Sequence, residues 1–299
     1  MDKKQPRVMV AGGTGYIGGG VALALHNNGY WIRALTRDLK RKPEGCDEAF
    51  EGHATIPSTL KGLCDGIDVV FSSIGIKGFG AKPTFWDVDY QANINILEEA
   101  KSAGVKHFVF VTTLGGPKMA LMCPLAEARE RVASAVIESG MDYNIFAPAG
   151  LFNDMAHALA AARHGMVLLL GDGEGLLNPL SALDLGDEIA KAIKDPAQRN
   201  KVRSVGGPET MTHRNVAELC FKILGKKPRI KATPSWLTGF IAEAVKHFND
   251  NAHALIKFFQ FIELSDDLSG EQIGHRKLED FLTHRARGLS DLEAEKAIL

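Results

Sequence analysis

The sequence lacks several features that would assign it to a class of protein at once. Its only cysteines are Cys46, Cys64, Cys123 and Cys220, which form no CxxC pair and have no histidine at ligand spacing. The cysteine pattern therefore indicates neither a zinc site nor a disulfide framework, and we expect the thiols to be reduced. No apolar run reaches membrane-spanning length, and the first residues contain no signal core or transit stretch. We expect a cytoplasmic protein without a metal or a membrane span; a targeting segment removed from the chain would leave no trace in it.

The chain also lacks an excess of charge. Its 35 Lys and Arg residues oppose 36 Asp and Glu residues, which leaves a net charge of -1. Such a balance provides no basic field to attract nucleic acid or an anionic membrane surface. Hydrophobic residues make up 45% of the 299 residues and charged residues 24%, values typical of globular proteins. We therefore expect a globular protein that does not bind nucleic acid.

Short apolar strands alternate with helical segments through the first half of the chain. Strands are expected at residues 8–11, 31–36, 67–75, 107–113 and 142–148, and helices at residues 18–28, 58–64, 87–103 and 124–139. Continuously apolar strands between helices are typical of a parallel sheet that is covered on both faces. The sequence thus predicts an α/β fold with a doubly wound parallel (Rossmann) sheet.

The alternation changes after residue 148. Helices are expected at residues 153–164, 181–193 and 212–224, and strands at 166–170 and 201–205, the latter returning to the sheet. A further helix would present one apolar face made of Trp236, Phe240, Ile241, Ala244, Val245 and Phe248. We predict a Rossmann domain over residues 1–150 and about 180–206. A smaller, mainly helical substrate or interaction portion would comprise residues 151–179 and 207–299.

The strongest motif is AGGTGYIGGG at residues 11–20, which follows a strand and opens a helix. Gly12 permits a tight turn, Gly15 lets the backbone approach a pyrophosphate, and Gly18 lets helix and strand pack closely. Because strand, turn, helix and the next strand all occur at the expected spacing, a purely structural turn is the minor interpretation. We expect the backbone of this turn to bind a dinucleotide, with further contacts from its other residues, Thr14, Tyr16 and Ile17.

The residue after the second strand indicates which dinucleotide is bound. An NAD-binding chain usually has an acid there for the ribose 2′-hydroxyl, but this chain has Thr36 and then Arg37. Arg37 can pair with a 2′-phosphate, so NADP(H) is favoured over NAD(H). The alternative is that Arg37 is a solvated loop charge, since Arg33, Lys40, Arg41 and Lys42 make the neighbourhood basic.

An ordered series of motifs then resembles a known family. The segments are GGTGYIGG, ALTRD, GLCDGIDVVFSSIGI, DVDYQANINILEEAKSAGVKHFVFVTT, ESGMDYNIFAP and LLLGDGEGLLNPLSALDLGDEIA. They are similar to the atypical short-chain dehydrogenase/reductase superfamily, nearest its NAD(P)H-binding, NmrA-like branch. The resemblance covers residues 6–230.

The resemblance implies cofactor contacts beyond the glycine turn. Ser73, Ile74 and Gly75 match positions beside the adenosine ribose. Thr112 and Thr113 match positions beside the nicotinamide ribose, and Pro148 and Ala149 match the backbone along the nicotinamide face. The alternative for Ser73 and Thr112 is that they only satisfy the backbone at strand ends.

The resemblance also shows where catalytic residues would stand. Catalytic relatives carry a Tyr that moves the substrate proton and, one helical turn later, a Lys that lowers its pKa and holds the ribose. Counting back from ESGMDY, the matching positions are Leu125 and Arg129, within LAEAR. Leucine has no proton to give, whereas Arg129 can still bind a ribose oxygen. Arg129, Lys118 and Thr113 are the weak catalytic candidates that remain.

Two functions of different classes follow. The first is an NADP(H)-dependent oxidoreductase that reduces a hydrophobic small molecule without the Tyr/Lys acid pair, since hydride transfer to a polarised alkene or quinone can take its proton from water. The second is a non-catalytic NADP(H) sensor or assembly protein of NmrA-like type. Isomerisation on a retained NADP is a third, less favoured option.

Apolar residues near the expected nicotinamide end indicate where a substrate would bind. The expected lining residues are Met119, Leu121, Met122, Phe152 and Met155, although core packing explains each of them equally well. The segment ALIKFFQFIEL at residues 254–264 is apolar on more than one face. It would be a partner or homo-oligomer interface, or a buried helix.

Overall fold

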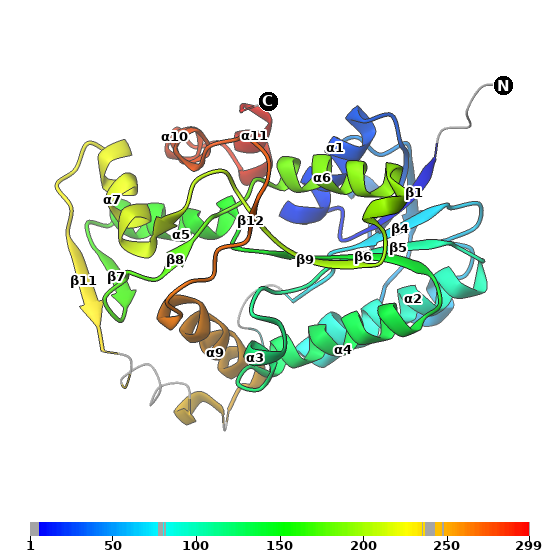
Figure 1. Ribbon diagram of the computed structural model, residues 1–299, viewed down its shortest axis with the longest axis horizontal. Helices are drawn as coiled ribbons and strands as arrows, with labels where there is room; N and C mark the ends of the chain where they lie inside the picture. The colour runs from blue at the N-terminus through cyan, green and yellow to red at the C-terminus, as the bar shows by residue number, and fades with distance from the viewer. Residues whose placement is uncertain are drawn as a thin grey trace.

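Eight of the described strands form one parallel sheet in the computed structural model (Figure 1), which describes residues 6–76, 80, 82–234, 236, 243–246 and 248–298. In chain order they are β1 (Arg7–Ala11), β2 (Trp31–Thr36), β3 (Glu48–Glu51), β4 (Val69–Ser72), β5 (His107–Val111), β6 (Asp142–Pro148), β9 (Lys201–Gly206) and β12 (Glu271–Gln272). Their order across the sheet is β3-β2-β1-β4-β5-β6-β9-β12. This is the Rossmann arrangement. All the strands are parallel, and the topological switch point, where the order of strand addition reverses, lies between β1 and β4. The predicted fold class is confirmed.

Helices cover both faces of the sheet. Helices α1 (Tyr16–Asn27) and α6 (Ala182–Lys194) lie on one face, and α2 (Ala92–Ser102) and α4 (Pro124–Glu138) lie on the other (Figure 1). Successive side chains of β1 alternate between the two layers, because Val8 and Val10 join one apolar cluster whereas Met9 joins the other. The side chains of the central strands β1, β4 and β5 are buried on both sides, which explains their largely apolar sequence.

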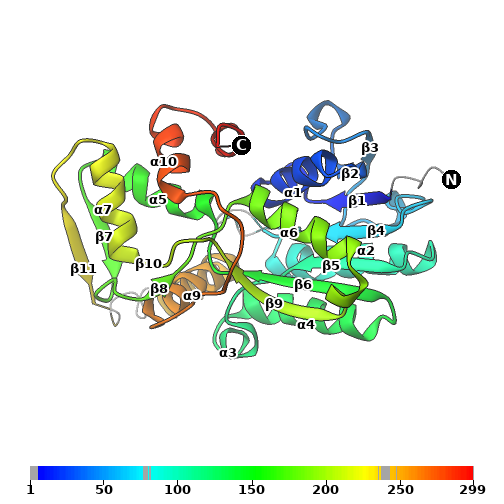
Figure 2. The same cartoon turned by 45° about the horizontal axis from the view of Figure 1, so that its top comes forward.

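The rest of the chain forms a smaller, mainly helical part at one end of the sheet (Figure 2). It contains α5 (Phe152–Arg163), α7 (His213–Ile223) and α10 (Leu278–Ala286), which share an apolar cluster. Two small sheets accompany them, β7 (Val167–Leu170) with β11 (Ile230–Thr233) and β8 (Leu176–Leu177) with β10 (Met211–Thr212). As expected, β9 returns to the main sheet, but so does β12 from within the range 207–299. The proposed division into domains stays a prediction.

Two further helices connect this part to the Rossmann sheet. Helix α9 (Asp250–Leu264) packs beside the start of α4 and the short helix α3 (Gly116–Ala120), as both views show. Helix α11 (Asp291–Lys296) reaches α1, where Leu292 lies beside Gly19. In the described part of the chain, no helix is long and apolar enough to cross a bilayer.

Several expected elements differ from the structure. The helix expected at residues 58–64 is only a 3₁₀ turn at Pro57–Thr59, and a π-helical segment, Trp86–Gln91, precedes α2. Strands β3 and β12 were not predicted, because each is short and neither shows the alternation or the apolar run that is typical of a strand. Of the apolar face expected near the C-terminus, Trp236 and Phe248 are 72% and 88% exposed, and the expectation that these residues share one helical face stays a prediction. Phe240 and Ile241, which belong to that expectation, lie outside the described residues.

A buried carboxyl group on α11 joins it to two helix starts in the Rossmann part. Glu295 is fully buried and accepts hydrogen bonds from the Tyr16 hydroxyl, from Ser181 Oγ at 2.6 Å and from the Ala182 amide at 3.2 Å. Burial, followed by the charge of Glu295, raises the pKa of Tyr16 well above its usual value, so the phenol stays protonated and donates. The end of the chain is thus attached where α1 and α6 begin.

Replacing Glu295 with alanine should therefore destabilise the fold. Three buried donors would lose their acceptor, and we expect the free energy of unfolding to fall by about 3 kcal/mol. Urea denaturation would measure the change. Lys296→Ala is the matched control, because Lys296 forms only a partly exposed ion pair with Glu44 and should matter by less than about 1 kcal/mol. Equal effects of the two substitutions would contradict this account of α11.

Candidate functional site

The glycine turn lies where the first strand ends and α1 begins. Gly12 has a φ of 90°, which favours glycine, and the Gly15 amide donates to the Gly12 carbonyl at 2.8 Å. A Cβ on Gly18 would lie 2.2 Å from the Gly12 oxygen, so the helix touches the turn directly. No acidic residue occupies the first turn of α1, and no side chain caps it. Its free amide groups and its dipole are therefore available to a phosphate.

Three neutral polar atoms beside this turn are buried and have no hydrogen-bond partner among the described residues. They are Ser73 Oγ after β4, Thr113 Oγ1 after β5 and Asn153 Oδ1 at the start of α5. All three follow consecutive neighbouring strands at the carboxyl edge of the sheet, where Rossmann folds bind dinucleotides. Buried polar groups are normally satisfied. These atoms therefore fit a polar ligand such as a dinucleotide cofactor, and Asn153 had no sequence signal.

The remaining expected cofactor contacts lie at the same edge of the sheet, with one difference, which concerns Thr112. Ser73 is so close to the turn that a Cβ on Gly12 would lie 2.9 Å from its Oγ. Thr112 is 5% exposed and its hydroxyl points toward Glu130 Oε1 at 3.4 Å, so Thr113 offers the free hydroxyl instead. Pro148 ends β6 and Ala149 follows it, and both are buried beside β9.

The side chains within the glycine turn have different environments. Thr14 is exposed, while Ile17 is partly buried against the apolar cluster of α1 and α6. Tyr16 directs its hydroxyl at Glu295, and its ring packs edge-on against Phe281 at 6.2 Å. Its role as a cofactor contact stays a prediction, in which the ring rather than the hydroxyl would face the ligand.

Arg129 occupies the position of the family's lysine and is held in a buried ion pair. Its Nε donates to Asp89 Oδ1 at 2.9 Å, its Nη2 lies 2.8 Å from the same oxygen, and its Nη1 donates to the Val111 carbonyl at 3.1 Å. Asp89 is fully buried and also accepts the Ile76 amide at 2.9 Å. Burial raises the pKa of Asp89, although Arg129 and the Ile76 amide stabilise the carboxylate.

The same ion pair explains one of the predicted glycines. A Cβ on Gly75 would lie 2.0 Å from Arg129 Nη2 and 2.8 Å from Asp89 Oδ1. The guanidinium therefore packs on the backbone of Gly75, next to Ile74, at the edge where the free hydroxyls lie. The structure brings together Arg129 and Gly75, both expected at the cofactor site, whereas Asp89 was missed because an acid within a helix carries no sequence signal.

No proton donor stands at the position of the family's tyrosine. Leu125 is 6% exposed and lies in an apolar cluster with Phe85 and Ala254. Cys123 nearby is 1% exposed, its Sγ donates to the Ala254 carbonyl at 3.5 Å, and burial raises the pKa of its thiol. A reactive thiolate is therefore not available there.

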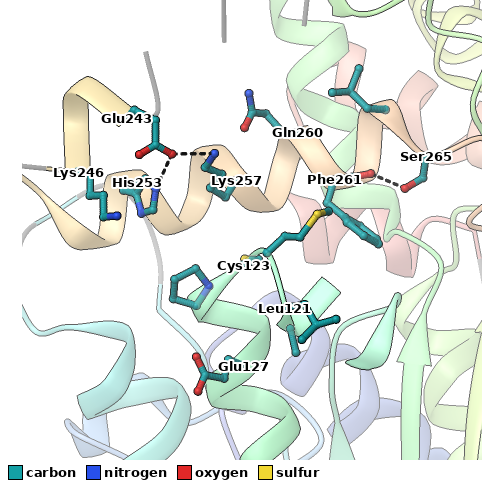
Figure 3. Close-up of a pocket in the computed structure, with 14 residues that line it drawn as sticks. Leu121, Cys123, Glu127, Glu243, Lys246, His253, Lys257, Gln260, Phe261 and Ser265 are labelled. Carbon is teal, nitrogen blue, oxygen red and sulfur yellow. Dashed lines mark hydrogen bonds and ion pairs between the residues drawn. The ribbon is translucent and has the colours of Figure 1, made fainter. Parts of the chain in front are cut away.

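Two pockets lie along α9, beside the loop that follows β5. The smaller, of about 300 Å³, is lined by Leu114, Gly115, Lys118 and Phe261 among others. The larger, of about 630 Å³, lies between the start of α4 and α9 (Figure 3). Lys118 is exposed and faces the smaller pocket. The contribution of α9 was not predicted, because the sequence beyond residue 233 matched no motif.

The expected substrate-lining residues divide between pocket and core. Leu121 and Met122 line the larger pocket and are 88% and 58% exposed. Met119 and Phe152 are instead buried in apolar clusters, at 0% and 1% exposure, and line neither pocket. Met155 is partly buried and packs against the cluster of α5, α7 and α10. The pattern of apolar residues in the sequence could not distinguish residues that line a pocket from residues that are buried in the hydrophobic core.

Arg37 is exposed directly after β2. Ala11 pairs with Leu35, so Arg37 lies at the same edge of the sheet as the glycine turn. The nearby acid, Asp38, is already engaged, because its Oδ1 caps the following 3₁₀ turn by accepting the Lys40 amide at 2.9 Å. Within the described ranges, no carboxylate forms an ion pair with Arg37, so its guanidinium can pair with a 2′-phosphate.

Arg37→Ala should change cofactor selectivity. Loss of a charge-assisted bond to the 2′-phosphate is expected to weaken NADPH binding on the order of 30-fold. NADH, which has no such phosphate, should bind almost as before. Fluorescence titration of both cofactors would measure the effect, with Arg41→Ala, an exposed arginine of the same loop, as control. An equal loss for both cofactors would refute the assignment of Arg37.

Comparison with known proteins agrees with this geometry. A family model described as NAD(P)H-binding matches residues 12–196. A chloroplastic divinyl chlorophyllide a 8-vinyl-reductase from Cucumis sativus is 28% identical over 281 residues, covering 87% of this chain and 65% of that protein. The chain thus spans less than two thirds of that reductase.

Two further similarities extend the comparison. The photosystem II assembly factor Ycf39 from Trieres chinensis is 22% identical over 268 residues, covering 88% of this chain and 83% of that protein. The structure of the NADPH-dependent quinone oxidoreductase QOR2 from Escherichia coli, complexed with NADPH, matches with a TM-score of 0.70 at 17% identity. That match covers 93% of this chain and 99% of the other, and it shows a shared fold.

Proposed function

The chain belongs to the NAD(P)H-binding family of the atypical short-chain dehydrogenase/reductase superfamily, and from this premise we propose that it is an NADPH-dependent reductase of a hydrophobic, unsaturated acceptor. The observation that carries the proposal is the position of Leu125. An apolar side chain lies where a proton donor would stand, while the atoms that would hold the cofactor are present. Such a site suits a reduction that does not need an acid from the protein.

The chain's own residues divide the work of binding. The amide groups of the turn at Gly12 and Gly15 would hold the pyrophosphate, and Arg37 would hold the 2′-phosphate. Ser73 and Thr113 would supply hydroxyl groups to the riboses. Arg129, fixed by Asp89, would present its remaining N–H groups at the same edge. When bound, NADPH supplies a hydride, and the acceptor takes the accompanying proton from water.

The absence of an acid decides between classes of acceptor. Reducing a ketone to an alcohol builds negative charge on oxygen, which the family's tyrosine neutralises. An acceptor whose π system delocalises that charge has less need of a positioned acid. The relatives are named for reactions of this second kind, a vinyl reduction and a quinone reduction. We therefore propose a conjugated alkene or a quinone rather than a simple carbonyl compound.

The proposal is tested by comparing two reactions of the same preparation. NADPH oxidation, followed by its absorbance, should occur with conjugated enones or quinones. NADP⁺ reduction by secondary alcohols should be undetectable, because no group at position 125 can remove the alcohol proton. Alcohol oxidation with a catalytic efficiency equal to that of enone or quinone reduction would overturn the proposal.

A second candidate is a non-catalytic NADP(H) sensor or assembly protein. The observation that favours it is the exposure of large apolar residues on one part of the molecule, with Leu121 and Phe248 each 88% exposed. The similarity to an assembly factor agrees with this alternative. A protein partner captured only with NADPH, and not with NADP⁺, in the absence of any turnover would favour the sensor over the reductase.

A further inference from the structure

We propose that the two pockets along α9 form one elongated site for an amphipathic ligand, with an apolar body against Phe261 and an anionic group at Lys246. The ligand class is a planar or chain-like apolar molecule that carries a carboxylate or sulfonate. The inference rests on the proposed function, because this ligand would be the acceptor that the reductase reduces. It specifies the charge and the shape of that acceptor.

The two pockets lead away from the proposed cofactor edge. Leu114 and Gly115 of the smaller pocket follow Thr113, whose hydroxyl is unsatisfied. Phe261 and Ser265 line both pockets, and Phe261 touches the loop so closely that a Cβ on Gly115 would lie 2.7 Å from its ring. A ligand with its reacting end near Thr113 would therefore extend past Phe261 into the larger pocket. The volume of the larger pocket, about 630 Å³, suits a ligand of drug-like size.

The larger pocket has an apolar end and a charged end. Leu121 and Phe261 lie toward one end, whereas Glu243, Lys246, His253 and Lys257 gather at the other (Figure 3). Leu121 is 88% exposed. Covering this apolar surface with a ligand would be favourable, since each Å² removed from water contributes about 25 cal/mol.

Ion pairing leaves one cation at the charged end. Lys257 Nζ lies 3.0 Å from Glu243 Oε1, and Glu127 Oε1 lies 2.7 Å from Arg131 Nη2. Within the described ranges, Lys246 has no ion pair, although its charge helps to lower the pKa of Glu243. Of the two lysines that line the larger pocket, it is thus the one that remains for an anionic ligand group.

A second, independent observation also points to a ligand. His253 is 9% exposed, and its buried Nε2 has no hydrogen-bond partner in the described part of the chain. The nearest carboxylate oxygen, Glu243 Oε1, is 3.9 Å away, which is too far for a hydrogen bond. Burial lowers the pKa of His253, so the imidazole is neutral at pH 7. An oxygen of the ligand would satisfy this nitrogen at the same end as Lys246.

A pair of fluorescent probes tests the charge directly. 1-Anilinonaphthalene-8-sulfonate and N-phenyl-1-naphthylamine share one apolar body and differ only in the sulfonate group. Both should bind the full-length protein, and Lys246→Gln should weaken the sulfonate probe about tenfold while the neutral probe binds as before. Lys101→Gln, at an exposed lysine on α2, is the control and should change neither affinity. Phe261→Ala should weaken both probes together.

A kinetic comparison separates the site from the proposed function. A quinone that carries a carboxylate should have a higher kcat/KM than its methyl ester, and Lys246→Gln should remove the difference. Loss of sulfonate-probe binding without any turnover would overturn the reductase but support the site. If the protein turned over quinones but Lys246→Gln changed neither the affinity for the sulfonate probe nor the preference for the carboxylate quinone over its ester, the site would be overturned and the reductase would stand. An equal loss of both probes on Lys246→Gln would also overturn it, because the charge would not be the cause.

Discussion

Replacing Asp89 with alanine should lower the free energy of unfolding by about 4 kcal/mol, because a buried guanidinium would lose the one carboxylate that pairs with it among the described residues. Arg129 is 14% exposed and Asp89 is 1% exposed at their side chains, so water cannot take over the role of either group. The same substitution removes the acceptor of the Ile76 amide, and the segment from Ser73 to Ile76 should lose its fixed position. We therefore also expect weaker NADPH binding. Chemical denaturation and cofactor titration would measure the two effects.

The double variant Asp89→Leu/Arg129→Leu separates the charge from the packing. Replacing both members of a buried pair with apolar residues is often nearly neutral, so most of the lost stability should return. NADPH affinity should not return, because the leucines offer no N–H group at the cofactor edge. If Asp89→Ala differed from wild type by less than about 1 kcal/mol, the buried pair described here would not exist in solution.

Gly18→Ala should nearly abolish NADPH binding. Its Cβ would lie 2.2 Å from the Gly12 oxygen and 2.8 Å from the Gly13 nitrogen, both backbone atoms that cannot rotate away. The helix start would have to separate from the turn, and the amide groups would no longer converge on one phosphate. Loss of one or two charge-assisted hydrogen bonds corresponds to a Kd on the order of 100-fold higher.

Gly19→Ala is the matched control for this prediction. Its Cβ would come no closer than 3.2 Å to the Gly13 oxygen, and the next neighbour is the flexible Leu292 side chain. Alanine is the better helix former, so stability should stay equal or rise by up to about 1 kcal/mol. NADPH affinity should stay close to that of wild type. If both variants lost the cofactor equally, the contact between Gly18 and the turn would not be the cause.

The positions of the main strands could be predicted because they are encoded locally. Short apolar runs such as residues 108–111 and 145–148, which lie between helical segments, are typical of strands buried on both faces, and the strands there matched the expected positions closely. The glycine turn was equally readable, since Gly12 and Gly18 serve backbone geometry that few other residues permit. Strands β3 and β12 were missed because partners distant in the sequence, rather than local pattern, make them strands.

For the candidate site, the sequence predicted only those residues whose type and spacing in a motif are informative by themselves. Arg129 could be located by counting from the ESGMDY segment, but its partner Asp89 is 40 residues earlier and looks like any helical acid. Met119 was expected in a pocket and is fully buried, because a methionine serves a wall and a core equally well. The role of α9 depends on how distant segments pack, which a single sequence does not reveal.

The most direct test of the central claim follows the hydride itself. The protein would be given NADPH deuterated on one face of nicotinamide C4, together with a conjugated enone, whose product keeps the label in a stable C–D bond. We predict that deuterium from one face, and not the other, appears in the product by mass spectrometry, and that the second hydrogen comes from solvent. Intact NADPH binding with no label in any product would contradict the claim that this chain is a reductase.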